Sequence, residues 1–457
     1  MIYLILLVGL ILRLVLSNQS FWLDEGASLM AAKVPLTQFF EYLKSDFHPP
    51  LYYLYLKLWL PLAGSSEWII RLPDILLGTA SIFLVFLLGK IIFGKGSKIP
   101  LLMSLFLALN PFHVYYTQEL RMYNLSAFFV LLSWLALLKN KYIFVSVANF
   151  LSLFTFYGAG FNFVSQGLYL LFTKKKDLGK FALSFVPIVV GFIFWWPVFS
   201  VQLSNGSFLQ EALPGWSLLS GSATIKSLLL IPIKFIIGRV NLDPQSLYFA
   251  VGGLLLVMFS LIILFSLKNK LSKPLWFFFL VPIILATIIS FKTPVLGYWR
   301  YLFILPAFTS LLAIGAMQLP KKLRTLTISF VCLVFVFSNL YFWLTPRFQR
   351  EDWRGLAKFI DGKNSLVILP FSGVFAPLNF YETDAVYLPS QVNLGKNESD
   401  LSQKLLLETE NFQNIYVLDY LADLTDPDRK ILNTVRELKQ KEKAVYNFNN
   451  LGQVYEF

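Results

Sequence analysis

Residues 21–28 read FWLDEGAS and follow the strongly apolar segment IYLILLVGLILRLVLS at residues 2–17. The chain has 457 residues, of which 56% are hydrophobic and only 14% are charged. A soluble globular chain usually carries about 25% charged residues, so this composition indicates an integral membrane protein. Carboxylates are scarce in such a chain. The adjacent pair Asp24 and Glu25, at the mouth of the first apolar segment, therefore suggests chemistry at the membrane surface.

Segments of about 20 apolar residues are long enough to cross a bilayer as helices. Before residue 346 the sequence contains about eleven such candidates, several of them short. The predicted spans are residues 2–17, 73–93, 100–115, 124–138, 142–157, 161–173, 181–200, 246–267, 275–291, 301–319 and 325–345. A further apolar piece at 225–238 is ambiguous between a surface helix and a re-entrant segment. The pattern predicts an all-α polytopic membrane domain.

Lysine and arginine gather in short connections between the predicted spans. The clusters are Lys90, Lys95 and Lys98; Lys139 and Lys141; Lys174, Lys175, Lys176 and Lys180; Lys268, Lys270 and Lys273; and Lys321, Lys322 and Arg324. Connections rich in these residues stay in the cytoplasm. We therefore expect a multi-pass protein of the plasma (inner) membrane, with a cytoplasmic N-terminus and an extracytoplasmic C-terminal domain.

The net charge of +13 is explained by these orientation signals and by contact with anionic membrane lipid. No nucleic-acid partner is therefore expected. The single cysteine, Cys332, excludes an intrachain disulfide and a cysteine metal site.

The segment 346–457 changes character, because charged residues become frequent and strand patterns alternate with helix patterns. The expected strands are SLVILP (365–370), AVYLPS (385–390) and NIYVLDYL (414–421), and the expected helices are DWRGLAKFID (352–361), SDLSQKLLLETE (399–410) and DPDRKILNTVRELKQ (426–440). The runs AVYNFNN and GQVYEF are expected to close with a hairpin. We predict a transmembrane domain at 1–345 and a small extracytoplasmic α/β domain at 346–457.

The connection at 18–72, between the first and second predicted spans, is much longer than an ordinary loop between helices. Its runs TQFFEYLKS and PLYYLYLKLW are amphipathic and aromatic, as helices on a membrane surface are. The sequence His48-Pro49-Pro50 predicts an extended corner between them, because residues before proline avoid the helical region. We expect this outer loop to carry the active site.

Three arginines, Arg71, Arg121 and Arg300, lie at predicted outer ends of spans. Arginine offers a planar fork that fits phosphate oxygens. A carboxylate beside such a phosphate is suited to remove a proton from an incoming hydroxyl or amine. Cations around the phosphate stabilise its charge as it leaves. Together these residue types suit displacement of a lipid-linked phosphate.

Five motifs in the same order carry a resemblance to a known family. They are FWLDEGAS (21–28), DFHPPLYY (46–53), EWIIRLP (67–73), QELRMY (118–123) and WRYLFILP (299–306). The chain resembles the polytopic GT-C glycosyltransferases, and in particular the protein O-mannosyltransferase-like superfamily, glycosyltransferase family 39. It is also similar to the bacterial transferases that add aminoarabinose to lipid A. The resemblance covers residues 1–345.

The resemblance implies transfer of a hexose or pentose from a polyprenyl-phosphate-linked donor, with inversion at the anomeric carbon. The acceptor, whether lipid, glycan or protein, and the donor sugar are not carried over. The family's catalytic base matches Asp24, and its arginine that contacts the donor phosphate matches Arg121. The histidine-proline-proline loop matches His48, Pro49 and Pro50.

These arguments give a set of expected site residues. The catalytic residues are Asp24 and Glu25; the donor phosphate-binding residues are Arg121, Arg300, Arg71 and Tyr301; and the residues that position the acceptor or the loop are Asp46, His48, Glu119, Tyr53 and Tyr123. No cofactor is required by this assignment. A divalent metal near Asp24, Glu25 and His48 stays open as an alternative.

Simpler interpretations stay open for each group. Asp24 is of a type that caps helices, and His48 before two prolines often only shapes a loop. Arg71 and Arg300 are placed where arginines extend toward lipid headgroups, and Glu119 is placed to orient Arg121. For the whole chain, the alternatives are a transporter or flippase of lipid-linked sugars, and a scaffold that acts through its outer domain.

Overall fold

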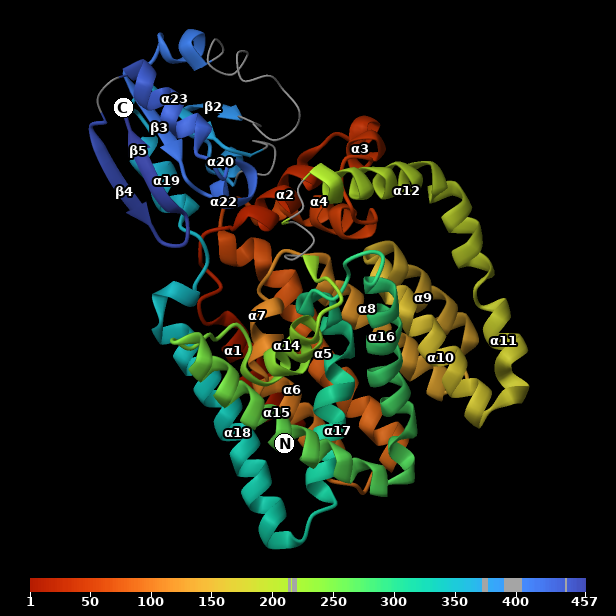
Figure 1. Cartoon of the computed structure of the whole chain (residues 1–457). Helices are drawn as coiled ribbons and strands as arrows, with labels where there is room; N and C mark the ends of the chain where they lie inside the picture. Colours follow the sequence, from red (N-terminus) through yellow and green to blue (C-terminus); the bar gives the residue numbers. More distant parts are fainter. Residues whose placement is uncertain (213–214, 216–219, 372–376, 390–404, 440–441) are drawn as a thin grey trace.

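The computed structural model describes residues 1–457 except 213–214, 216–219, 372–376, 390–404 and 440–441 (Figure 1). Its larger part is a bundle of apolar helices, and its C-terminal part is a small domain with a five-stranded sheet. The helices α2 (Leu23–Lys33), α3 (Leu36–Leu43) and α4 (Leu51–Ala63) lie at one end of the bundle, next to the sheet domain (Figure 1).

The bundle is built from helices of very different lengths. They are α1 (Ile2–Leu14), α5 (Glu67–Phe93), α6 (Ile99–Leu109), α7 (Pro111–Tyr116), α8 (Met122–Leu138), α9 (Tyr142–Thr155), α10 (Gly160–Thr173), α11 (Leu178–Leu183), α12 (Val186–Ala212), α14 (Ile225–Ile237), α15 (Gln245–Phe265), α16 (Lys273–Ser290), α17 (Leu305–Met317) and α18 (Lys321–Leu344). Six candidate spans in the described residues are long and apolar enough to cross a membrane, and shorter apolar helices accompany them. The polytopic membrane fold is therefore confirmed, while the count of about eleven spans stays a prediction.

The predicted span 100–115 is wrong as a continuous helix, because the chain breaks at Asn110 between α6 and α7. The Asn110 side chain accepts a hydrogen bond from the His113 amide at 3.0 Å and starts α7. A broken helix leaves carbonyl groups without partners. Arg13 donates to the carbonyl of Ala108, and Asn339 donates to the carbonyl of Leu109. Buried polar side chains thus stabilise the break.

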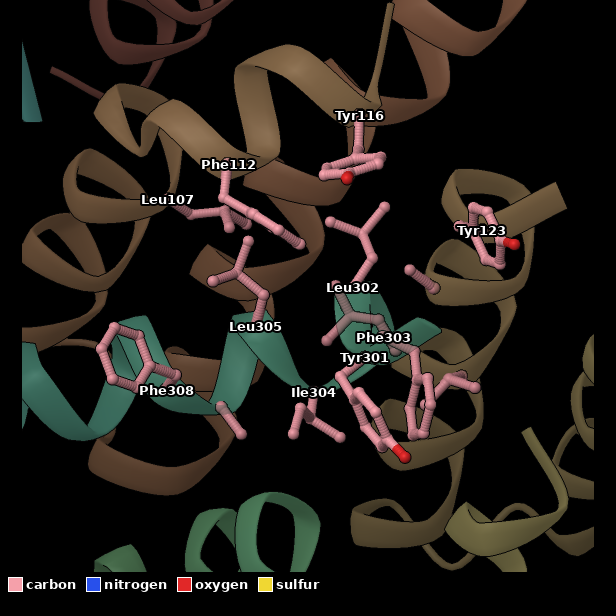
Figure 2. Packing of buried hydrophobic residues seen from close by; sticks show 14 of the residues in the cluster. Leu107, Phe112, Tyr116, Tyr123, Tyr301, Leu302, Phe303, Ile304, Leu305 and Phe308 are labelled. Carbon is pink, nitrogen blue, oxygen red and sulfur yellow. The ribbon is translucent and has the colours of Figure 1, made fainter. Parts of the chain in front are cut away.

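The predicted span 301–319 also differs, because its first turns form the 3-10 helix η5 (Tyr298–Ile304) before α17 begins. Figure 2 shows side chains of η5 and α17, among them Leu302 and Leu305, packed with Phe112 and Tyr116 of α7. The tighter 3-10 geometry turns the chain before α17 begins. Arg300 lies in this turn, and its charge acts on His48 at the corner between α3 and α4.

The ambiguous segment 225–238 forms α14, which packs into the bundle and is not a surface helix. Its residues Ile231, Phe235 and Ile236 are buried. Phe235 packs edge-on against Phe112, with ring centroids 5.1 Å apart. With 13 residues, α14 is about 20 Å long at 1.5 Å per residue, which is too short to cross a bilayer.

The C-terminal domain is a sheet with strand order β2-β1-β3-β5-β4. Its strands are β1 (Ser365–Leu369), β2 (Val386–Pro389), β3 (Asn414–Leu418), β4 (Ala444–Phe448) and β5 (Gly452–Glu456), and its main helices are α19 (Trp353–Ile360) and α23 (Lys430–Lys439). The first three strands are parallel, and the last two form the expected antiparallel hairpin. The predicted helix at 399–410 lies partly outside the described residues.

Separate hydrophobic clusters cover the two faces of this sheet. Trp353 and Leu356 of α19 lie in the cluster on one face, and Ile431 and Val435 of α23 lie in the cluster on the other. Alternate residues of a strand point to opposite faces. Val367 and Ile368 of β1 accordingly belong to different clusters.

Close packing of α15 against α17 depends on Gly315. A Cβ atom there would lie 1.8 Å from the carbonyl oxygen of Ile262, which is backbone and cannot rotate away. We predict that Gly315→Ala destabilises the protein by about 1–3 kcal/mol through overpacking. Thermal unfolding in detergent checks this. Gly253→Ala is the matched control on α15, because its added methyl group has no atom within 4 Å. Equal melting temperatures for the two variants would contradict the prediction.

Candidate active site

The two acidic residues of the FWLDEGAS motif have opposite environments in the first turn of α2. The Asp24 side chain is 44% exposed, whereas the Glu25 side chain is fully buried. Adjacent helical residues point in different directions, so one carboxylate faces outward and the other faces the bundle. The helix N-terminus carries partial positive charge and favours both acids. Only Asp24 is accessible to a substrate.

Glu25 is held by positive groups from three parts of the chain. Its carboxylate accepts hydrogen bonds from Arg71 at 3.0 Å and 2.6 Å and from the Leu120 amide at 3.0 Å, and it lies 3.4 Å from Arg350. Burial alone would raise the pKa of Glu25, but Arg350 and Arg71 outweigh it and lower that pKa. The predicted catalytic role of Glu25 stays a prediction, and these contacts favour a role in positioning the loop.

All N–H donors of Arg71 are engaged by Glu25 and by backbone carbonyls. Its Nε and one Nη2 hydrogen bond go to Glu25, and its remaining bonds go to the carbonyls of Ser17, Gln19 and Ser20. A guanidinium has five N–H donors, and these bonds engage all of them. The predicted phosphate contact of Arg71 stays a prediction, and these five bonds leave the residue no free donor for a phosphate. The arginine instead fastens the chain before α2.

The segment at residues 350–354, which reads REDWR, completes this arrangement from the C-terminal domain. The Glu351 carboxylate accepts hydrogen bonds from the Leu23 amide at 3.0 Å, from Trp353 at 2.7 Å and from Tyr420 at 2.7 Å. Arg350 donates to the carbonyl of Gln118 at 3.1 Å. These residues were not singled out from the sequence. The dense run of charges directly after the last span could have indicated them as candidates for contacts with the membrane domain.

Arg121 precedes α8 and lies beside Asp24. Its Nη2 is 3.6 Å from the Asp24 carboxylate, and its Nη1 donates to the Asp24 carbonyl at 3.1 Å and to Ser28 at 3.2 Å. The residue is 7% exposed, and its Nε has no hydrogen-bond partner in the part of the chain that the structure describes. A buried N–H without a partner is costly, so this atom is available to a ligand.

Asp46, His48 and Tyr53 form a hydrogen-bonded group at the corner between α3 and α4. Asp46 lies 3.0 Å from His48 Nδ1 and accepts from Tyr53 at 2.6 Å. Burial lowers the pKa of His48, and the charges of Arg121 and Arg300 lower it further, against the opposing effect of Asp46. His48 is therefore neutral at neutral pH, with Asp46 fixing its ring.

The structure thus gathers one polar group from four separate motifs, which we call the Asp24 cluster. Its members are Asp24, Asp46, His48, Tyr53, Arg121, Tyr123 and Arg300, and charge interactions connect them. Arg300 donates to the carbonyls of Pro294 and Ser220 and stays partly exposed. Tyr301 does not join, because its buried side chain donates to the Val295 carbonyl at 3.0 Å. The expected phosphate contact of Tyr301 stays a prediction, while its hydroxyl is engaged by the backbone.

Glu119 interacts by charge with Arg121 of the cluster and with Arg350. It is 2% exposed, and its Oε2 has no hydrogen-bond partner among the described residues. Burial raises the pKa of Glu119 to about 7, although Arg350 opposes the shift. The carboxyl group is therefore placed to influence Arg121 and Arg350 rather than to contact an acceptor.

Asp24, Glu25 and His48 do not form a set of metal ligands in the structure. Across the described part of the chain, no group of three or more histidine, cysteine, aspartate or glutamate side chains is close enough to hold a metal ion. Glu25 is engaged by Arg71, and His48 is engaged by Asp46. We therefore derive no step that uses a metal.

The Glu25–Arg71 ion pair predicts a large stability effect. Glu25→Gln removes a buried charge and leaves Arg71 and Arg350 uncompensated, which costs about 3–5 kcal/mol. Unfolding temperature or denaturant unfolding in detergent measures the loss. Glu41→Gln is the control, because Glu41 is 75% exposed in its pair with Lys44 and should change stability by less than about 1 kcal/mol. Similar losses in both variants would refute the proposed role.

Glu119 predicts a pH dependence of stability. Its folded-state pKa of about 7 lies above the unfolded value of about 4.3, so the folded state binds the extra proton. The stabilising contribution is complete below the unfolded pKa and is lost as pH rises toward 7. Glu119→Gln should therefore flatten the decline in melting temperature between about pH 5 and pH 7 relative to the native protein. Parallel curves would exclude this assignment.

Residues 47–200 match a family model described as dolichyl-phosphate-mannose-protein mannosyltransferase. No curated protein matches the chain. The matched region contains α4, α5 and α8, together with His48, Arg71 and Arg121. It therefore includes much of the Asp24 cluster.

Solved structures share the fold along nearly the whole chain. ArnT from Cupriavidus metallidurans in the apo state gives a TM-score of 0.60 at 12% identity, covering 99% of this chain and 97% of that chain. The same protein bound to undecaprenyl phosphate gives 0.62 at 14% identity with the same coverage. The apo oligosaccharyltransferase from Archaeoglobus fulgidus gives 0.50 at 10% identity, covering 92% of this chain and 70% of that chain. The chain is therefore a polytopic membrane protein with the fold of the GT-C glycosyltransferases.

Proposed function

We propose that the chain is an inverting glycosyltransferase that moves a sugar from a polyprenyl-phosphate donor to an acceptor at the outer face of the membrane. The observation that carries the proposal is the placement of Asp24. Its carboxylate is half-exposed at the start of a helix, while the residue after it is locked in a buried network. An exposed base on a rigid support is what proton abstraction requires.

Asp24 takes the proton of the acceptor hydroxyl or amine. The acceptor atom then attacks the anomeric carbon from the side opposite the phosphate, the bond between that carbon and the phosphate oxygen breaks, and the configuration inverts. The proton stays on the Asp24 carboxyl group, and polyprenyl phosphate leaves with the bonding electrons. Arg121, 3.6 Å from Asp24, holds the carboxylate in place.

Arg121 and Arg300 balance the charge that develops on the leaving phosphate. The Nε of Arg121 lacks a hydrogen-bond partner within the described residues, and Arg300 uses only Nη1 in the contacts given above. Arginine groups placed where charge develops stabilise a transition state without reorganisation. Neutral His48, oriented by Asp46, positions the acceptor or the loop, and Tyr53 and Tyr123 line the same group.

A polyprenyl phosphate as donor is supported by the family match and by the undecaprenyl phosphate bound to the similar ArnT structure. We infer a hexosyl or pentosyl group as the sugar and a lipid, glycan or protein as the acceptor. The five basic clusters support a cytoplasmic N-terminus, with α2, α3, α4 and the C-terminal domain outside.

A transporter or flippase of lipid-linked sugars is the weaker alternative. Such proteins place their binding site near the middle of the membrane between repeated halves. Here the Asp24 cluster is assembled mainly by α2, the α3–α4 corner and the residues before α8 and α17. The fold shared with ArnT also favours the transferase.

Asp24→Asn tests the base directly. The variant keeps the size of the side chain but cannot accept the proton, so transfer from a radiolabelled polyprenyl-phosphate sugar should fall by about 10²–10⁴-fold. The unfolding temperature should stay within a few degrees of that of the native protein, because Asp24 is half-exposed.

Glu41→Gln is the matched control for this assay, since Glu41 is an exposed carboxylate in the same outer loop. It should retain full transfer. Arg300→Gln should lower kcat more than it raises the KM for the donor, because Arg300 balances charge that develops only as the phosphate leaves. Near-normal transfer by folded Asp24→Asn would show that another group is the base.

A further inference from the structure

A cavity of about 400 Å³ lies beside the Asp24 cluster and is strongly basic. Residues from the α14–α15 region, from η5 and from the chain after α18 line it. Its most characteristic residues are Lys234, Arg239, Arg347, Arg350, Tyr115 and Tyr298. The cavity shares no residue with the Asp24 cluster, but Trp22, two residues before Asp24, borders it.

The cations of this cavity are held mainly by aromatic rings and backbone groups. The guanidinium groups of Arg239 and Arg350 lie 5.3 Å and 4.9 Å from the centre of the Tyr115 ring. Lys234 lies 5.9 Å from the ring centre of Tyr298 and donates to a backbone carbonyl at 3.0 Å. Aromatic faces attract cations but do not neutralise their charge. The guanidinium charges of Arg239 and Arg350 therefore remain inside the cavity, while burial lowers the pKa of Lys234 to about 7.

Two of these cations are buried. Lys234 is 7% exposed and Arg350 is 8% exposed. Arg350 Nη1 is 3.4 Å from Glu25 but has no hydrogen-bond partner among the described residues. A buried charged donor without a hydrogen bond is costly, and its cost is recovered when an anion binds.

The acidic residues at the cavity are already engaged. Glu351 accepts hydrogen bonds from the Leu23 amide, Trp353 and Tyr420. Asp243 is paired with Arg347 at the exposed rim. Four basic side chains, Lys234, Arg239, Arg347 and Arg350, thus line the cavity with two carboxylates, Asp243 and Glu351. Arg350 also compensates Glu25, and burial lowers the pKa of Lys234 to about 7. The lining still has more basic than acidic groups, which suits an anion.

We infer that this cavity binds a phosphate or diphosphate group of the acceptor. The inference rests on the proposed function, because it takes the Asp24 cluster as the place of the donor phosphate. The cavity is polar and small, so it suits a charged headgroup rather than a polyprenyl chain. An acceptor anchored there would reach Asp24 past Trp22. The acceptor class is therefore an anionic, phosphorylated molecule.

The test measures binding to the full-length protein in nanodiscs, without turnover. The probes are inorganic diphosphate, for the proposed cavity, and undecaprenyl phosphate, for the donor site. Arg239→Gln should weaken diphosphate binding by about tenfold or more, since it removes a charged hydrogen-bond donor, and should leave undecaprenyl phosphate binding unchanged. Arg300→Gln should have the opposite pattern.

Controls separate the site from general effects of charge and folding. Arg436→Gln removes an arginine that is paired with Glu442 on the C-terminal domain, away from the cavity, and should bind both probes normally. Arg239→Lys keeps the charge and should retain much of the diphosphate binding. These variants show whether a loss is specific to the cavity.

Two results would overturn the inference. In the first, the native protein does not bind diphosphate at millimolar concentration. In the second, Arg239→Gln loses undecaprenyl phosphate, which would make the cavity the donor site. Neither result depends on catalysis, so each is distinguishable from a failure of the proposed transferase activity, which Asp24→Asn tests separately.

Discussion

The fully buried ion pair between Glu25 and Arg71 is the interaction on which the site depends. Removing two charges from water is expensive, and the cost is offset only when geometry is good and every donor is engaged. Arg71 meets that condition through Glu25 and the carbonyls of residues 17, 19 and 20. The backbone before α2 is thereby fixed, and Asp24 is left as the carboxylate that faces outward.

The same pair joins distant parts of the chain. Arg350 approaches Glu25 from the C-terminal domain, and Glu351 binds the first amide of α2. The residues that lead into the sheet domain therefore support the helix turn that carries Asp24. On either side of this support lie two sets of cations, one around Arg121 and one around Lys234.

Much of the membrane fold was predictable, because apolar runs of sufficient length have few alternatives to helices. The break at Asn110 was not, since it depends on Arg13 and Asn339, which lie far away in the sequence. At the site, motif order singled out Asp24 and Arg121, and the structure places them 3.6 Å apart, while their catalytic roles stay predictions. The buried ion pair between Arg71 and Glu25 was not predicted, because a phosphate-binding arginine and a structural arginine look the same in a sequence until their partners are known.

Lys234 was not singled out from the sequence as a candidate functional residue. It interrupts the apolar run IPIKFII, and a charge in such a run is itself a functional signal. The contact of both Arg71 and Arg350 with Glu25 also has a consequence for biosynthesis. In a chain made from its N-terminus, Glu25 and Arg71 are synthesised early and Arg350 only near the end of translation. Until then Glu25 lacks one of its cations, so the support beneath Asp24 is complete only after residue 350 has been added.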